Sequence, residues 1–406
     1  MKFTAFNFHE NLGEGIRSLG FEEATPVQQS AIPAILEGKD IIASAQTGTG
    51  KTAAFLLPVI QQLIGLPHDG SIKALIIVPT RELAIQIDQQ MEGLSYFTGV
   101  SSIPVYGGTG GTVFSTEQKA LSEGADMVIC TPGRMIAHIN MGYVKLHALR
   151  FLILDEADRM LDMGFYEDIQ KILKYLPAKR QNMLFSATLP HAIIALAKKI
   201  LHDPFEINIS RSKPAERVKQ GAYILYKNQK TALAEHLLQN TELKSVLIFC
   251  GTKEKTTLLT RELRRLKVNV AEIHSDIQQQ ERENTLNAFK SKTLRVLVAT
   301  DILSRGIDVD DIDLVVNYDV PHDAEDYIHR VGRTARAANE GMAITLVSEE
   351  DQRRLATIET FLGAPIPKYN APEALGEVPA YHPERFAQKR SGGKRVFRKK
   401  PNRERK

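Results

Sequence analysis

Short runs of apolar residues, bounded by polar or glycine-containing turns, recur along the chain. Each run is followed by a longer stretch with apolar residues at helical spacing, as at residues 81–91 and 166–176. Continuous apolar runs of about four to eight residues are typical of parallel strands that are covered on both faces. The pattern therefore predicts a βα alternation, with strands at residues 74–78, 127–130, 151–154 and 183–185.

A polar stretch at residues 210–214 interrupts this alternation, which restarts with apolar runs at 245–250, 296–299 and 314–316. We therefore expect two tandem α/β domains with parallel sheets. Past about residue 368 the periodicity fades, which predicts a disordered basic extension. The expected parts are an N-terminal domain at 1–209, a linker at 210–217, a C-terminal domain at 218–368 and the extension at 369–406.

Length and composition limit the class of protein. A chain of 406 residues is long enough for two or three domains with cores of their own. We find no run of about 18 apolar residues and no signal-peptide pattern at the N-terminus, so a cytoplasmic protein without a membrane segment is expected. Cys130 and Cys250 lie at the ends of apolar runs and form no Cys-x-x-Cys pair, which favours buried free thiols over metal or redox chemistry.

Charge is distributed unevenly along the chain. Residues 385–406 carry eleven Lys or Arg and one acidic residue, a local charge of +10. The remaining residues carry −6, so the folded part is mildly acidic. Long-range attraction to a polyanion therefore lies in the tail, and contacts in the folded part have to be local and geometrically placed. A tail that only increases solubility is the alternative.

The segment from Ala45 to Thr52 reads Ala-Gln-Thr-Gly-Thr-Gly-Lys-Thr, between an apolar run and a helical pattern. This is the context of a P-loop, although Ala45 stands where the general pattern has glycine. Glycines let backbone N–H groups turn toward phosphates, and the helix that follows adds its positive N-terminal end. Lys51 would reach the β and γ phosphates, and Thr52 would bind Mg²⁺. The expected cradle comprises Thr47, Gly48, Thr49, Gly50, Lys51 and Thr52.

A second acidic motif, Asp155-Glu156-Ala157-Asp158, follows the apolar run at 151–154 directly. Burying carboxylates at the end of a strand costs free energy unless a positive charge lies beside them, and a bound Mg²⁺ ion would supply that charge. Asp155 is then the carboxylate on the Mg²⁺ side, and Glu156 would orient or deprotonate the attacking water. An acidic first helical turn without catalytic work is the alternative for this motif taken alone.

These motifs, in this order, resemble the DEAD-box RNA helicases of helicase superfamily 2, over roughly residues 1–365. The resemblance implies two RecA-like domains and an ATP-dependent RNA helicase that uses ATP and Mg²⁺ and contacts the RNA backbone with little sequence specificity. Chain length, the run at 155–165 and the short basic tail are most similar to the bacterial RhlE group. Partners in ribosome assembly or RNA decay would suit the family, and the sequence singles out neither.

Carried over onto this chain, the family's adenine-binding segment falls on residues 20–28. Gln28 would pair with the adenine edge, because an amide offers both a donor and an acceptor, and Phe21 would lie against the ring. Asp308 would hold the ribose hydroxyls. Arg333 and Arg336 match the family's arginine fingers, which stabilise charge on the γ-phosphate. The family's residues for coupling hydrolysis to unwinding across the two domains match Asp158, Ser186, Thr188 and His329.

Small residues, hydroxyls and single arginines follow several apolar runs in both halves of the chain. Such groups grip phosphates through N–H groups and helix N-termini without reading bases. Each patch alone is more often a helix cap or loop, and the family resemblance joins them into one RNA-binding face. The expected RNA contacts are Thr80, Arg81, Gly108, Thr131, Gly133, Arg134, Gly251, Thr252, Gln279, Arg282, Thr300 and Gly306.

Two other functions use the same motifs. An ATP-controlled RNA clamp would bind RNA tightly and use hydrolysis only to time its release. A DNA helicase of the same superfamily would respond equally to DNA and RNA, since no single residue in the sequence identifies the 2′-hydroxyl.

Overall fold

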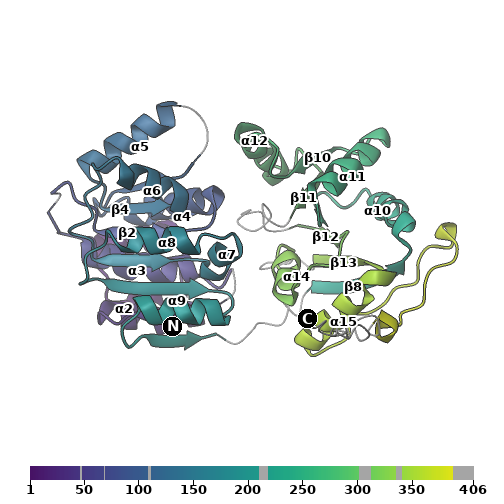
Figure 1. The fold of residues 1–406 in the computed structure, drawn as a ribbon, viewed down its shortest axis with the longest axis horizontal. Helices are drawn as coiled ribbons and strands as arrows, with labels where there is room; N and C mark the ends of the chain where they lie inside the picture. The colour runs from purple at the N-terminus through teal and green to yellow at the C-terminus, as the bar shows by residue number, and fades with distance from the viewer. Residues whose placement is uncertain are drawn as a thin grey trace, which may run out of the picture. The chain divides into compact units, whose positions relative to one another are not determined.

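The computed structural model describes residues 1–45, 48–67, 69–107, 111–209, 218–300, 312–334 and 341–386. This part of the chain forms two compact units, each built around one parallel sheet (Figure 1). The predicted α/β class with two parallel-sheet domains is confirmed. Within the described residues no helix combines the length and the apolar character that a membrane crossing requires.

The first sheet has seven parallel strands in the order β3-β4-β2-β5-β6-β1-β7. Successive residues of a strand point to opposite faces of the sheet, so a strand inside the sheet contributes side chains to two cores. In β5, for example, Ile153 packs into one core and Leu152 and Leu154 into the other. The strands are β1 (Ile41–Ser44), β2 (Ala74–Ile77), β3 (Ser102–Val105), β4 (Met127–Cys130), β5 (Phe151–Leu154), β6 (Gln181–Ser186) and β7 (Phe205–Asn208).

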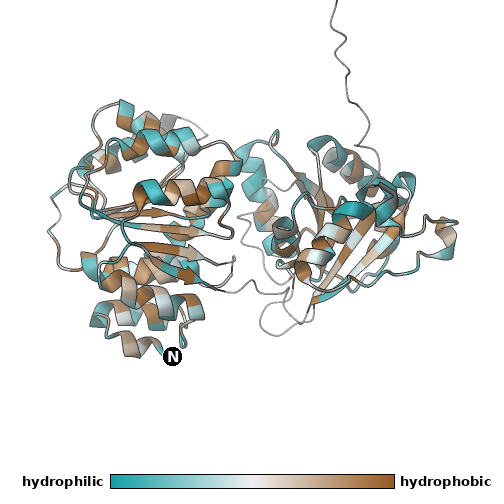
Figure 2. Cartoon of the chain, turned by 60° about the horizontal axis from the view of Figure 1, so that its bottom comes forward, coloured by the Kyte–Doolittle hydropathy of each residue, from teal (hydrophilic) through white to brown (hydrophobic). Residues whose placement is uncertain are grey.

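Helices cover both faces of this sheet (Figure 1). Side chains of α1 to α4 pack into one core, and side chains of α6 to α9 pack into the other. Hydrophobic colour gathers on the strands and on the helix faces turned toward them (Figure 2). The helices are α1 (Glu10–Ser18), α2 (Pro26–Leu36), α3 (Lys51–Leu63), α4 (Arg81–Ser95), α5 (Gly111–Glu123), α6 (Pro132–Asn140), α7 (Ala157–Asp162), α8 (Tyr166–Leu173) and α9 (His191–Ile200), with the 3-10 helix η1 at Phe3–Phe6.

The second sheet has six parallel strands in the order β10-β11-β9-β12-β13-β8. Its strands are β8 (Val218–Leu225), β9 (Val246–Cys250), β10 (Val270–Ile273), β11 (Val296–Thr300), β12 (Leu314–Asn317) and β13 (Gly341–Ser348). The helices of this part of the chain are α10 (Lys230–Leu238), α11 (Lys253–Arg265), α12 (Gln279–Lys290), α14 (Ala324–Val331) and α15 (Gln352–Leu362), with short 3-10 helices η2 (Lys227–Gln229), η3 (Glu349–Asp351), η4 (Glu373–Leu375) and η5 (Pro383–Phe386).

The two sheets share one topology. Read in chain order, β1 to β6 and β8 to β13 occupy the same relative positions, with β7 added beside β1 in the first sheet. The residue that follows a given strand of one sheet therefore has a positional counterpart in the other. This matters because ligands of such folds bind at the carboxyl ends of the strands.

The first strand of the second sheet, β8, was not among the predicted apolar runs. The alternation was expected to restart at residues 245–250, but β8 (Val218–Leu225) precedes that run. β8 is an edge strand, and Lys219 and Gln220 interrupt its apolar sequence. A strand with one open edge does not need the continuous apolar run by which central strands are recognised.

Residues 366–386, which we call the C-terminal strap, correct the prediction that residues 369–406 are disordered throughout. Tyr369 donates its N–H to the carbonyl oxygen of Ala222 in β8, at 2.8 Å. The side-chain amide of Gln229 donates to the carbonyl oxygens of Leu375 and Glu377, at 2.9 and 2.8 Å. The strap is held by hydrogen bonds that involve its backbone, by the ion pair of Lys368 with Glu359 and by Leu375, which packs against the core of the second domain. Such scattered contacts leave no periodic hydropathy pattern in the sequence. The predicted disorder of residues 387–406 lies outside the described residues.

Both cysteines are buried free thiols, as predicted. Cys130 ends β4 and Cys250 ends β9. Burial raises the pKa of the Cys130 thiol far above its ordinary value, and it raises the pKa of Cys250 to about 12. Thiols in this state are poor nucleophiles and poor metal ligands.

Candidate functional site

The loop between β1 and α3 has the backbone of a phosphate cradle where it is described. Gly48 and Gly50 have φ angles of +81° and +88°, a conformation that side chains rarely tolerate. A Cβ on Gly50 would also lie 2.5 Å from Nε2 of Gln28, so the Gln28 side chain would have to shift to admit it. Thr49 lies between these glycines, and the predicted contribution of Thr47 lies outside the described residues.

Lys51 is the first residue of α3, and Thr52 follows it. The Lys51 side chain is buried, yet its Nζ has no hydrogen-bond partner among the described residues. A buried ammonium group without a partner is costly, so this position suits an anionic ligand. The orphaned nitrogen is the observation that best fits a nucleotide phosphate here.

Asp155 follows β5 directly and is fully enclosed. Burial raises the pKa of its carboxyl group to about 6, against the opposing charge of Lys51. One of its oxygens accepts a hydrogen bond from the Glu156 N–H at 2.9 Å. A buried carboxylate whose negative charge is so poorly compensated fits a divalent cation bound with the phosphates.

Glu156 is held in a strained conformation, with a left-handed φ of +50°. Its Oε2 accepts a hydrogen bond from Nη1 of Arg159 at 3.1 Å, and both side chains are buried. A non-glycine residue in this region persists where the surroundings enforce it, often at functional sites. Arg159 thus fixes the carboxylate that was predicted to act on the attacking water.

Gln28 joins the start of α2 to the phosphate loop. Its Oε1 accepts from the Thr25 N–H at 2.8 Å, and its Nε2 donates to the Gly50 carbonyl oxygen at 3.1 Å. An amide has capacity for two further hydrogen bonds, so the predicted adenine contact is compatible with this position. Phe21 is half-buried and stacks against Phe3, with ring centroids 5.9 Å apart.

The predicted coupling residues of the first domain come together. Oδ2 of Asp158 accepts hydrogen bonds from the Thr188 N–H at 2.8 Å, from the Thr188 hydroxyl at 3.1 Å and from the Ala187 N–H at 3.1 Å. The Ser186 hydroxyl donates to the Thr188 carbonyl oxygen at 2.6 Å and accepts from the Asp158 N–H at 3.2 Å. The end of β6 is therefore tied to α7, the helix that begins directly after Glu156.

The predicted RNA contacts of the first domain lie where strands end and helices begin. Thr80 caps α4 by accepting from the Leu83 N–H at 3.3 Å. The Arg81 guanidinium lies over the Tyr106 ring, 5.3 Å from its centroid, and its Nε and Nη2 are buried without a hydrogen-bond partner among the described residues. Arg81 thus has donors to offer a ligand.

The first turn of α6 carries Thr131 as its cap and Gly133 as its second residue. Gly133 needs no left-handed conformation, and a Cβ there would meet nothing within 4 Å. The fold itself does not require this glycine, which fits close approach of a ligand to the backbone. Arg134 instead pairs with Glu117, at 2.7 Å from its Nε and 2.6 Å from its Nη2. Gly108 lies outside the described residues.

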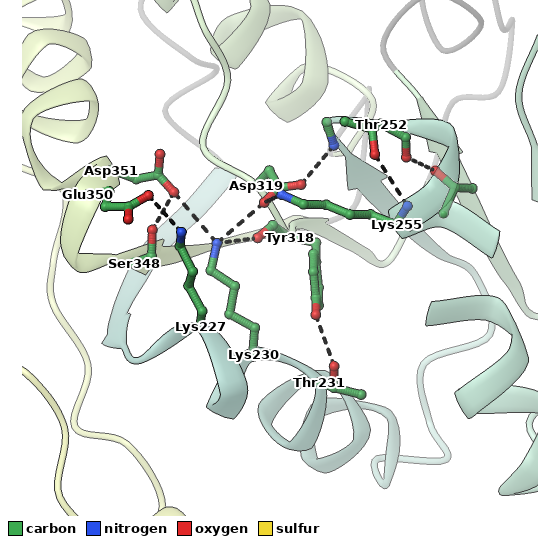
Figure 3. Close-up of polar contacts among 12 residues, drawn as sticks. Lys227, Lys230, Thr231, Thr252, Lys255, Tyr318, Asp319, Ser348, Glu350 and Asp351 are labelled. Atoms are coloured by element: carbon green, nitrogen blue, oxygen red, sulfur yellow. Dashed lines mark hydrogen bonds and ion pairs between the residues drawn. The ribbon is translucent and has the colours of Figure 1, made fainter. Parts of the chain in front are cut away.

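In the second domain, Gly251 and Thr252 stand between β9 and α11. The Gly251 N–H donates to Oδ2 of Asp319 at 2.9 Å, and the Thr252 hydroxyl caps α11 by accepting from the Lys255 N–H at 3.3 Å (Figure 3). Nζ of Lys255 contacts Oδ1 of Asp319 at 2.7 Å. Asp319 therefore positions the whole turn.

Other predicted residues of this half lie on three elements. Gln279 begins α12 and bonds Glu283 at 2.9 Å and Arg282, and Thr300 ends β11. His329 lies in the last turn of α14, and Arg333 follows that helix and is buried. The predictions for Gly306, Asp308 and Arg336 fall outside the described residues.

Known protein families share this arrangement of motifs. The DEAD/DEAH box helicase model matches residues 25–196, and the model of the helicase conserved C-terminal domain matches residues 229–338. The ATP-dependent RNA helicase CshA of Listeria monocytogenes is 42% identical over 88% of this chain and 68% of its own. The chain belongs to the DEAD/DEAH box helicases.

Two further relatives support the assignment of this helicase. The ATP-dependent RNA helicase DbpA of Bacillus subtilis is 39% identical over 95% of this chain and 79% of its own. The solved structure of S. cerevisiae Dbp5 bound to RNA and ADP BeF3 aligns with a TM-score of 0.81, at 29% identity over 91% of this chain and 95% of that chain. The protein is an ATP-dependent RNA helicase, an enzyme that hydrolyses ATP and binds RNA.

The helicase carries a modified counterpart of its phosphate site in the second sheet. Lys230 begins α10 after β8, as Lys51 begins α3 after β1. Nζ of Lys230 donates to the Tyr318 carbonyl oxygen at 2.9 Å and lies 3.6 Å from Asp319 and 3.8 Å from Asp351 (Figure 3). The chain's own oxygens thus satisfy this buried lysine, beside a cavity of about 450 Å³.

Replacing Asp319 with asparagine is expected to destabilise the second domain by about 2 kcal/mol at pH 7, because Gly251 and Lys255 lose a charged acceptor. Burial favours a higher pKa for Asp319, but hydrogen bonds from Lys255 and the Gly251 N–H outweigh it and lower the pKa. A carboxyl group with a lowered folded-state pKa stabilises above its unfolded-state pKa, and the effect is lost as the pH falls through the folded-state value.

The difference in unfolding free energy between this variant and the parent should therefore shrink progressively below about pH 4. Urea unfolding of both proteins at a series of pH values measures it. A difference that stays constant from pH 7 to pH 3 would contradict the assigned charge interaction.

Sequence reasoning missed the residues that hold the predicted ones in place. Glu117, Arg159 and Asp319 each bond a predicted site residue, and none of the three was itself predicted to belong to the site. Asp319 has the clearest signal in the sequence, because it follows the apolar run at 314–316 closely. Glu117 lies within a helix, where a single glutamate is unremarkable until its burial is seen.

Proposed function

We propose that this helicase uses ATP with Mg²⁺, bound in the first domain, to open short RNA duplexes locally. The observation that supports this most directly is the buried Lys51 ammonium, which has no hydrogen-bond partner in the part of the chain that the structure describes, next to the poorly compensated Asp155 carboxylate. Such a pair fits a negatively charged phosphate together with a divalent cation.

In this proposal each site residue has one task. Lys51 and the glycine loop bind the phosphates, and Thr52 and Asp155 would hold Mg²⁺, which when bound screens phosphate charge. Glu156, oriented by Arg159, accepts a proton from the attacking water. Arg333 and Arg336 would stabilise charge on the γ-phosphate, worth about 10³ to 10⁵ in turnover. Nucleoside recognition is assigned to Phe21, Gln28 and Asp308, and coupling to Asp158, Ser186, Thr188 and His329.

The RNA face is proposed to grip phosphates through helix N-termini and hydroxyls in both domains. This assignment is supported by the capped helix starts at Thr80 and Thr252 and by the Arg81 donors, which have no hydrogen-bond partner within the described ranges. The basic residues within 385–406 would add salt-sensitive affinity for neighbouring RNA. We also propose that the chain belongs to the RhlE group of the family, which its length, the run at 155–165 and its basic tail support. The proposed enzyme works in the cytoplasm and has domains at 1–209 and 218–368, joined by a linker at 210–217.

The proposal predicts that RNA is a much better activator of ATP hydrolysis than DNA of the same sequence. RNA offers 2′-hydroxyl groups and an A-form backbone, which a DNA strand lacks. Steady-state phosphate release with matched RNA and DNA strands, at saturating ATP, measures the difference. Equal stimulation by both strands would favour a DNA helicase of the same superfamily.

A further inference from the structure

We propose that Glu117 is a positioning residue for RNA binding, and that Arg134 acts through it rather than as a phosphate ligand. Glu117, Arg134, Phe114 and His138 form what we call the α5–α6 brace. The brace fixes two backbone segments of the proposed RNA face, so this inference rests on the proposed function. The inference gives Glu117 a function in RNA binding, and it changes the role predicted for Arg134 from a phosphate ligand to a positioning residue.

Glu117 is nearly inaccessible, with 2% of its surface exposed, and its carboxylate accepts three hydrogen bonds and makes one further ion-pair contact. Oε1 accepts from the Tyr106 N–H at 3.0 Å. Oε2 accepts from Nε of Arg134 at 2.7 Å and from Nε2 of His138 at 2.9 Å. Nη2 of Arg134 forms an ion pair with the same oxygen at 2.6 Å. A buried carboxylate with this many donors is held rigidly, because losing any one of them leaves charge uncompensated.

His138 completes the brace from the second turn of α6. Its Nε2 must carry the hydrogen, because the ionised Glu117 carboxylate only accepts. Nδ1 is then free to accept from the Tyr143 hydroxyl, which contacts it. The His138 ring also stacks on Phe114, with centroids 4.6 Å apart at an angle of 16°. The side chain of His138 is fully buried, so it packs inside the protein and does not contact a ligand.

Arg134 is committed to this cluster. Its guanidinium lies 4.6 Å from the centroid of the Phe114 ring, and its side chain is 17% exposed. Its Nε donates a hydrogen bond to Glu117, and its Nη2 forms an ion pair with the same carboxylate, which neutralises the Arg134 charge at short range. A phosphate would have to compete with a buried carboxylate for the same donors, and in the low dielectric of that position it would lose.

Arg81, in the same domain, differs from Arg134 in the hydrogen bonding of its guanidinium group. Its Nε and Nη2 are buried without a hydrogen-bond partner among the described residues. Its ring neighbour Tyr106 is the residue whose N–H is held by Glu117. We therefore assign the side-chain phosphate contact to Arg81, and we assign to the brace the task of holding the backbone around it.

The position of the brace explains what it holds. Tyr106 directly precedes Gly107 and Gly108, and Arg134 is the third residue of α6, whose first N–H groups have no partner inside the helix. Fixing Arg134 therefore orients those N–H groups, and fixing Tyr106 sets the start of the glycine segment. Backbone N–H groups at a helix start bind phosphate well only when they are aimed in advance.

Salt-dependent RNA binding by the full-length protein tests the inference. The variants are Glu117→Gln, Arg134→Gln, their double combination and Arg81→Gln, each titrated with a single-stranded uridine oligonucleotide and a non-hydrolysable ATP analogue across KCl concentrations. We expect Glu117→Gln and Arg134→Gln each to weaken binding about tenfold, the equivalent of one charge-assisted hydrogen bond. Their salt slopes should match the parent, and the double variant should be no weaker than the weaker single one.

Arg81→Gln should weaken binding and reduce the salt slope by about 0.7, as expected for one phosphate contact on a single strand. A slope reduced by the same amount in Arg134→Gln would overturn the inference, as would unchanged affinity in Glu117→Gln. If Glu117→Gln fails to fold, the Arg134→Gln slope alone decides. If Arg81→Gln leaves affinity and slope unchanged while RNA still binds, the proposed RNA face itself is wrong and the brace has nothing to position.

Discussion

Replacing Lys51 with alanine is expected to reduce ATP turnover by about 10³-fold, with or without RNA. The Lys51 ammonium is buried at the first turn of α3 and has no hydrogen-bond partner among the described residues, so its charge is available for a phosphate. Without it, the phosphates and the buried Asp155 carboxylate would face each other with less compensation. Steady-state phosphate release at saturating ATP measures the loss.

The second sheet supplies a matched control for this variant. Lys230 occupies the equivalent position, but its charge is already satisfied by Tyr318, Asp319 and Asp351. Lys230→Ala should lower the thermal stability of the second domain and leave RNA-independent ATP hydrolysis unchanged. Turnover retained in Lys51→Ala, or lost equally in both variants, would contradict the assignment of the phosphate site to the first domain.

Replacing Glu156 with glutamine is expected to lower turnover by about 10² to 10⁴ while ATP and RNA binding are kept. Glutamine preserves the shape of the side chain and can still accept a hydrogen bond from Arg159, but it cannot take a proton from water. The variant should therefore stall with both ligands bound and release RNA slowly. Single-turnover hydrolysis and the RNA dissociation rate after ATP addition measure the two effects.

A control for charge loss alone is Glu167→Gln, in the exposed first turn of α8. This variant should hydrolyse ATP and release RNA like the parent. Rapid RNA release from Glu156→Gln would contradict the role assigned to that carboxylate, and so would turnover at the parental rate.

The parts of the fold that the sequence predicts are those in which burial leaves a pattern. The central strands at 127–130 and 151–154 agree with β4 and β5 at both ends, because strands covered on both faces must be continuously apolar. The edge strand β8 was missed, since one open edge relaxes that demand. The C-terminal strap was missed because its contacts leave no pattern in the sequence. Its main-chain carbonyl groups, which every residue has, accept from Gln229 and Gln352, and its contact with Glu359 is made by the single side chain of Tyr381.

The candidate site likewise has residues that the sequence predicts and residues that it does not predict. The glycines and Lys51 are predictable because few residues satisfy a left-handed turn followed by a buried cation. The residues that hold these side chains in position are not predictable, because any element that folds nearby can supply them. Glu117 reaches Arg134 from another helix, 17 positions away in the chain. Only the folded structure shows that Arg134 is bound to Glu117 and that Arg81 has donors without a partner in the described part of the chain.

Strand displacement tests the central claim, that this chain couples ATP to the opening of RNA, most directly. A short RNA duplex with a fluorophore and quencher on opposite strands should separate when the full-length protein and ATP are added. It should remain paired with ADP, and with the Lys51→Ala variant under the same conditions. Tight ATP-dependent binding of the duplex without any strand separation would contradict the account and identify the protein as an RNA clamp.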